Sequence, residues 1–145
     1  MIERISNDKT HLAIIIRNDF SKEGIEFFTS EMDPLQLGYM NREKNYVIPP
    51  HTHNNVDRNI NATHEVLFIK SGKIRIDFYT SEKKYLKSTI ANCGDVILLA
   101  DGGHGFKMLE KSEIIEVKQG PYIGDLDKQR FNSIDDGDIN EITSL

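Results

Sequence analysis

The sequence predicts an all-β protein in which short strands form a barrel or sandwich. Short runs of β-branched and aromatic residues recur along the chain, and turns rich in Gly, Pro, Asn and Asp separate them. The periodicity that marks amphipathic helices is nearly absent. At 145 residues, the chain is long enough for one domain with a sizeable core.

The strands expected in the first third of the chain are short. His11 to Arg17 is apolar and β-branched, which predicts a buried strand. Residues 24–29 and 35–40 are further strand candidates between polar turns. Tyr46-Val47-Ile48 leads into Pro49-Pro50, and the two prolines favour an extended chain while withholding two ladder donors. We therefore expect the residues after Pro50 to be extended.

The centre of the chain predicts a hairpin over residues 66–80, with its turn at Ser71-Gly72. In the second arm, apolar side chains at positions 74, 76 and 78 alternate with polar ones. This alternation places Arg75, Asp77 and Tyr79 on a face exposed to water. Further strands are expected over residues 85–90, 96–99, 105–109 and 113–118.

Composition and charge limit the function classes. The net charge is -5, and the 18 basic residues form no stripe, which argues against a nucleic-acid partner. The single cysteine, Cys93, excludes an internal disulfide, and its position before Gly94 favours a small buried residue over a nucleophile. No apolar run is long enough for a bilayer and no secretion signal is evident, so we expect a cytoplasmic protein without membrane contact.

The end of the chain is polar. We expect one barrel domain over residues 1–132 and an acidic, flexible tail over residues 133–145. The tail has few apolar anchors and four acidic residues: Asp135, Asp136, Asp138 and Glu141. No chemistry is expected there.

The tripeptide His51-Thr52-His53 is the most informative motif. Two histidines at i and i+2 of an extended strand point to the same face. An isolated pair of this kind is a common accident and also fits two surface residues. Together with Glu65 and His104, however, it would provide three imidazoles and a carboxylate, a ligand set suited to a divalent metal.

The flanking residues resemble the two sequence motifs of the cupin superfamily. Pro50-His51-Thr52-His53 is followed by Glu65, six residues and Gly72, and the second motif runs from Gly94-Asp95 to Gly102 and His104. The motif regions span positions 49 to 108. Eleven residues separate His53 from Glu65, more than is usual in that family, and Ala100 stands where a proline is common.

The resemblance implies a jelly-roll barrel that binds one metal through His51, His53, Glu65 and His104. Iron, manganese, nickel, cobalt and zinc all suit these ligands, so the element stays open. If Glu65 faces inward, strand period places Leu67 and Ile69 below it, and Phe106 and Met108 follow His104 in the same way. His64 would then face outward or cap the preceding loop. The resemblance also implies a homodimer formed through N-terminal strands.

The long loop between His53 and Glu65 is placed to touch a ligand. Its one cation, Arg58, suits a carboxylate or phosphate group. The alternative is a solvated Asn-rich loop in which Arg58 pairs with Asp57 or with a surface acid. We retain Arg58, Leu67, Phe106 and Met108 as candidate substrate-binding residues.

Three functions are compatible with these features. The first is a small-molecule enzyme that uses the metal as a Lewis acid, isomerase-like or dioxygenase-like. The strand run from Glu65 to Tyr79 resembles small cupins of bacterial surface-sugar gene clusters, which implies a sugar or sugar-derived substrate and a role in carbohydrate metabolism. The alternatives are a metal-anchored ligand-binding module without turnover and a mainly structural barrel. No acid, base or specificity pocket can be named from the sequence.

Overall fold

The structure, a computed structural model, describes residues 1–8, 10–139 and 142–143 of the chain. The described part is all-β, with strands in three sheets, two short 3₁₀ helices and no α-helix. None of the three sheets closes into a barrel. The all-β prediction is thus confirmed, while the jelly-roll barrel stays a prediction.

The chain divides into two compact units, which we describe separately. Unit 1 comprises residues 1–20 and 63–145, and unit 2 comprises residues 21–62. The sequence predicts one domain over residues 1–132 and a tail over residues 133–145. The division into two units does not test that prediction. Positions 140–141 and 144–145 of the predicted tail lie outside the described residues.

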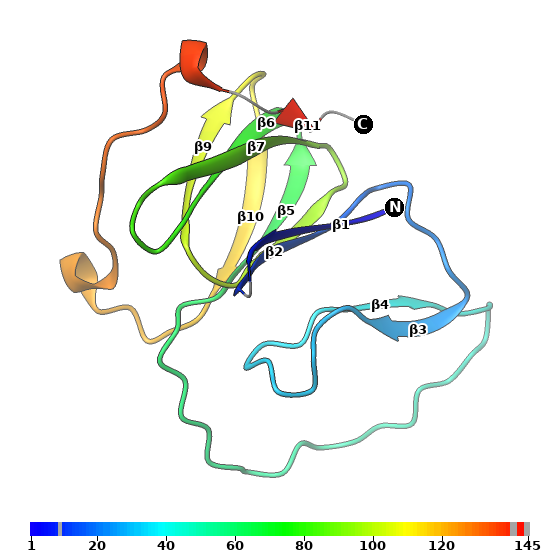
Figure 1. Ribbon diagram of the computed structural model, residues 1–145. Coiled ribbons are helices and arrows are strands. Elements are labelled where there is room, and N and C mark those ends of the chain that lie inside the picture. The colour runs from blue at the N-terminus through cyan, green and yellow to red at the C-terminus, as the bar shows by residue number, and fades with distance from the viewer. Residues whose placement is uncertain (9, 140–141, 144–145) are drawn as a thin grey trace. The chain divides into compact units, whose positions relative to one another are not determined.

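Unit 1 contains a five-stranded and a four-stranded sheet (Figure 1). The order in the first is β1-β2-β8-β5-β10, all antiparallel. The order in the second is β11-β7-β6-β9, with β11 parallel to β7 and the other pairs antiparallel. The strands of the first sheet are β1 (Ile2–Asn7), β2 (Thr10–Ile16), β5 (Glu65–Ser71), β8 (Val96–Leu99) and β10 (Glu113–Lys118). Those of the second are β6 (Lys73–Tyr79), β7 (Tyr85–Asn92), β9 (Gly103–Met108) and β11 (Ile142–Thr143).

One hydrophobic core joins the two sheets of unit 1. Their inward-facing apolar side chains form a single buried cluster, as expected where alternate residues of two facing sheets interdigitate. Burial of each such Ile or Leu contributes about 1.5–3 kcal/mol of transfer free energy. The cluster contains Ile5, Leu12, Ala13, Ile15, Leu67, Ile69, Ile97 and Leu99 from the first sheet and its turns, and Ile74, Ile76, Phe78 and Ala91 from the second.

The outward face of β6 is covered, contrary to the sequence prediction. Arg75, Asp77 and Tyr79 are only 6%, 3% and 4% exposed. The chain after β10, residues 119–139, is called the C-terminal segment here. Its residues 131–136 contact this face. The backbone N–H of Ile134 donates to the Tyr79 hydroxyl at 3.0 Å, and the Arg75 guanidinium pairs with Asp136 at 2.8 Å. A period-2 pattern cannot show that a distant segment will cover the polar face.

Unit 2 contains one hairpin, formed by β3 (Gly24–Phe27) and β4 (Gly38–Asn41). The backbone N–H of Phe28 extends the pairing with a 2.8 Å bond to the Leu37 carbonyl. No strand is described in the rest of the unit, residues 42–62. The two histidines after Pro50, expected on an extended strand, therefore lie in irregular chain.

Candidate functional site

Glu65 opens β5 on its inward face. Leu67 and Ile69, which share this face by strand period, are 3% and 0% exposed. The side chain of Glu65 is itself only 12% exposed. A carboxylate therefore stands at the rim of the apolar core, as the sequence predicts.

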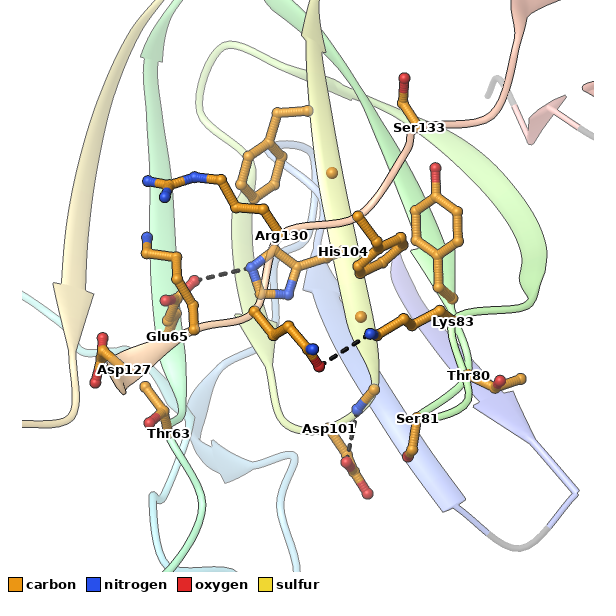
Figure 2. Close-up of a pocket in the computed structure, with 18 of the residues that line it drawn as sticks. Thr63, Glu65, Thr80, Ser81, Lys83, Asp101, His104, Asp127, Arg130 and Ser133 are labelled. Carbon is orange, nitrogen blue, oxygen red and sulfur yellow. Dashed lines mark hydrogen bonds and ion pairs between the residues drawn. The ribbon is translucent and has the colours of Figure 1, made fainter. Parts of the chain in front are cut away.

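His104 lies on β9 and meets this carboxylate. It is paired in register with Phe78 of β6, so both side chains point to the inner face of the four-stranded sheet. The Nε2 atom of His104 lies 3.1 Å from Oε2 of Glu65 (Figure 2). This hydrogen bond from His104 is the largest influence on Glu65 and lowers the pKa of its carboxyl, against the opposing effect of burial. The positive charges of Lys118 and Lys128 act in the same direction.

A cavity of about 800 Å³ surrounds the pair. It lies beside β9 and β10, which are edge strands of the two sheets of unit 1 and do not pair with each other. A cavity of this size suits a small organic ligand. The strands line it with Glu65, Leu67, Tyr79, Gly103, His104, Gly105, Phe106, Ile114 and Glu116, and the loops add Thr63, Thr80, Ser81, Lys83, Asp101, Gly102, Asp127, Lys128, Gln129, Arg130, Phe131 and Ser133.

The C-terminal segment forms one side of this cavity. In Figure 2 it crosses in front of His104, with Asp127 before the crossing and Ser133 after it. Asp127 accepts a 2.5 Å bond from Lys118, and the Phe131 ring packs edge-on against Tyr79 with 5.0 Å between ring centroids. Sequence reasoning missed these residues. The signal available was Phe131, an aromatic residue within an otherwise polar stretch.

The candidate substrate-binding residues fall into three groups. Leu67 and Phe106 line the cavity. Met108 shares the inner face of β9 with Phe106, but it is 49% exposed and does not line the cavity. Arg58 belongs to unit 2, where it is exposed and has no partner among the described residues.

The other two predicted metal ligands also lie in unit 2. The rings of His51 and His53 pack edge-to-face with 5.3 Å between centroids, and both residues are exposed. Nδ1 of His51 donates to the Pro49 carbonyl at 3.0 Å, since a carbonyl can only accept. The structure therefore brings Glu65 to His104 and His51 to His53. Within the described residues, no group of three or more His, Cys, Asp or Glu side chains is close enough to hold a metal.

Two further residues singled out from the sequence occupy well-defined places. His64 is buried, at 7% exposed, and its Nδ1 atom has no hydrogen-bond partner in the described structure. Cys93 is exposed, contrary to the expectation of a buried residue, and its thiol contacts the Lys70 carbonyl at 3.3 Å. Neither residue lines the cavity.

No protein-family model, curated protein or solved structure matches this chain. Among the described residues there is no helix long and apolar enough to cross a membrane. The function must therefore be argued from the site.

Proposed function

We propose that the protein is a metal-binding cupin in which a divalent transition metal is held by Glu65, His104, His51 and His53. The observation that carries the proposal is the 3.1 Å approach of Glu65 and His104 at the rim of the cavity. Two ligands about 2.1 Å from one ion, at angles between square and tetrahedral, lie about 3.0–3.4 Å apart. The distance within the pair is therefore compatible with adjacent positions on one metal ion, which would take the place of the proton that His104 Nε2 now donates to Glu65.

His51 of unit 2 has a tautomer suited to the same role. The bond from His51 Nδ1 to the Pro49 carbonyl keeps the proton on that nitrogen and leaves Nε2 with a lone pair. A second hydrogen bond of this kind is typical of metal-ligating histidines, whose orientation it fixes. The proposal requires both histidines to reach the ion that Glu65 and His104 bind.

Strand pairing in unit 1 supports the jelly-roll part of the proposal. β5 pairs with both β8 and β10, and β6 pairs with both β7 and β9. This arrangement, with consecutive strands divided between two facing sheets, is compatible with the centre of a double-sheet jelly roll.

The activity we propose is that of a small-molecule enzyme, isomerase-like or dioxygenase-like, acting on a sugar or sugar-derived substrate. A metal bound at this position would act as a Lewis acid on an oxygen of the substrate. The chain would supply the cavity, its apolar wall at Leu67 and Phe106, and the charges that orient the ligand.

The decisive test is elemental analysis of the purified protein and of two variants, Glu65→Gln and His51→Ala/His104→Ala. One equivalent of metal in the wild type and none in either variant is the expected result. His64→Gln is the matched control, because it removes a neighbouring imidazole outside the proposed ligand set and should keep the metal. A wild-type protein that stays metal-free after reloading would overturn the proposal and leave a ligand-binding or structural barrel.

A further inference from the structure

The cations around the cavity differ in whether they have a partner. Lys83, which lines the cavity, donates to Gln129, while three cations outside its lining are held by acids of the C-terminal segment: Arg75 and Lys107 by Asp136, and Lys118 by Asp127. Lys128 and Arg130 have no ion pair or hydrogen bond among the described residues, although both line the cavity. The nearest acid along the chain, Asp127, is already bonded to Lys118.

The segment that carries the two free cations is attached on both sides. Before Lys128, Asp127 is bonded to Lys118 of β10. After Arg130, the Phe131 ring packs against Tyr79, and the Ile134 N–H donates to the Tyr79 hydroxyl. Attachment on both sides lowers the conformational entropy that Lys128 and Arg130 would lose on binding a ligand.

The position of the cations relative to the site is also informative. Figure 2 shows the Arg130 segment crossing the cavity in front of His104. The hydroxyl groups of Thr63, Thr80 and Ser133 add neutral hydrogen-bonding groups to the wall.

We propose that Lys128 and Arg130 bind the anionic group, a phosphate or a carboxylate, of the small molecule that occupies this cavity. Guanidinium and ammonium donors suit both oxyanions, and Arg can bind either through two parallel N–H bonds. The rest of the molecule would extend past Phe106 towards Glu65 and His104. The inference rests on the proposed ligand-binding role of the cavity and names the ligand as an anion.

The test is a titration of ¹⁵N-labelled protein with inorganic phosphate and, separately, with succinate, each against chloride at the same ionic strength. We expect saturable changes in the amide signals of residues 128–131 with at least one of the two probes, which also tells phosphate from carboxylate specificity. In Lys128→Gln/Arg130→Gln the dissociation constant should rise at least about tenfold. Arg4→Gln/Lys111→Gln is the matched control, with the same loss of charge at two exposed positions outside the cavity, and should bind as the wild type does.

Metal content measured in the same samples separates this inference from the proposed function. Saturable anion binding in protein that takes up no metal would overturn the metal site and leave the anion site standing. Metal-loaded protein whose amide signals respond to phosphate and succinate no more than to chloride would overturn the anion site. An equal loss of affinity in the control pair would also overturn it, since net charge alone would then explain the effect.

Discussion

Gly72, which joins β5 to β6, has a backbone conformation that other residues adopt with difficulty. Its φ is +82°, and a Cβ atom there would lie 2.4 Å from the Lys111 carbonyl and from the Ser112 hydroxyl. Gly72→Ala should therefore lower the free energy of unfolding by on the order of 1–3 kcal/mol, through backbone strain and a steric clash.

Urea denaturation followed by circular dichroism measures this loss. Gly137→Ala is the control, because a Cβ at Gly137 meets no atom within 4 Å and its φ is not in the positive range. Equal midpoints for the two variants would show that the turn at Gly72 has a different backbone.

Asp136 fixes the C-terminal segment to the outer face of the four-stranded sheet. Its carboxylate accepts hydrogen bonds from Lys107 and Arg75, which lower the pKa of Asp136, Lys107 having the largest effect. A carboxyl group whose pKa is lower in the folded state stabilises that state above its unfolded pKa, and this contribution is lost as the pH falls through the folded value. The attachment should thus weaken below about pH 4.

Carboxylate NMR titration measures this pKa directly. We expect the Asp136 pKa to rise towards its usual value of 3.8 in Lys107→Met, because the largest of the lowering influences is removed. Lys111→Met, an exposed lysine without a role at Asp136, serves as the control. A pKa of 3.8 in the wild-type protein would contradict the ion pairs described here.

The position of a single side chain could be predicted where the residue lies in a regular strand, because side chains alternate between the two faces there. The inward position of Glu65 was predictable, because Leu67 and Ile69 mark the face of a regular strand. Lys128 and Arg130 could not be found in this way, since they lie in irregular chain whose placement depends on distant contacts such as Phe131 with Tyr79.

At the scale of elements, a buried ionic cluster links β1, β2 and β7 to the turn before β8. The Arg17 guanidinium contacts Asp95 at 2.9 Å, Thr89 at 3.0 Å and Glu3. Asp95 also accepts from the backbone N–H groups of Asn18 and Asn92 at 2.8 and 2.9 Å. With Arg17 and Asp95 at 7% and 2% side-chain exposure, neither charge has water available as a substitute partner.

Asp95→Leu should therefore destabilise the fold strongly. Removal of one partner leaves the Arg17 charge buried and incompletely compensated, which costs about 3–5 kcal/mol. The measurement is the free energy of unfolding in urea, with Glu110→Gln as a control that removes an exposed charge. If the double variant Arg17→Met/Asp95→Leu is no more stable than Asp95→Leu, the loss does not come from the unpaired arginine.

The strands with the most regular patterns were predicted best. Val96–Leu99 and Glu113–Lys118 match β8 and β10 residue for residue, and β2, β6, β7 and β9 differ at their ends by a few residues. β1 was missed because Ile2–Asn7 is short and mostly polar, and pairing with β2 makes it a strand. The exposed face expected for β6 was wrong for a related reason, since tertiary contacts with the C-terminal segment cover it.

At the scale of the whole molecule, the all-β class follows from the sequence, but closure of a barrel does not. β9 and β10 are edge strands of their sheets, and a closed barrel would require further pairing at those edges. The strand expected over residues 35–40 corresponds to β4, and residues 42–62 contain no strand that could extend either sheet edge. The homodimer inferred from the resemblance stays a prediction, to be checked by analytical ultracentrifugation.

The proposed metal site makes a prediction for the stability of the entire chain, because its ligands come from both units. Metal that binds the folded state alone stabilises it by about 2.7 kcal/mol at a hundredfold excess over the dissociation constant. For a chain of this size, the melting temperature should then rise by about 5–10 °C on metal addition and fall again with a chelator.

His51→Ala/His53→Ala removes ligands from unit 2, and Glu65→Gln removes one from unit 1. If one ion joins the two sets, either variant should lose most of the increase measured by calorimetry, whereas His64→Gln should retain it. Loss in Glu65→Gln but full retention in His51→Ala/His53→Ala would show instead that the ion is held by unit 1, and that the His51-Thr52-His53 motif has no part in binding it.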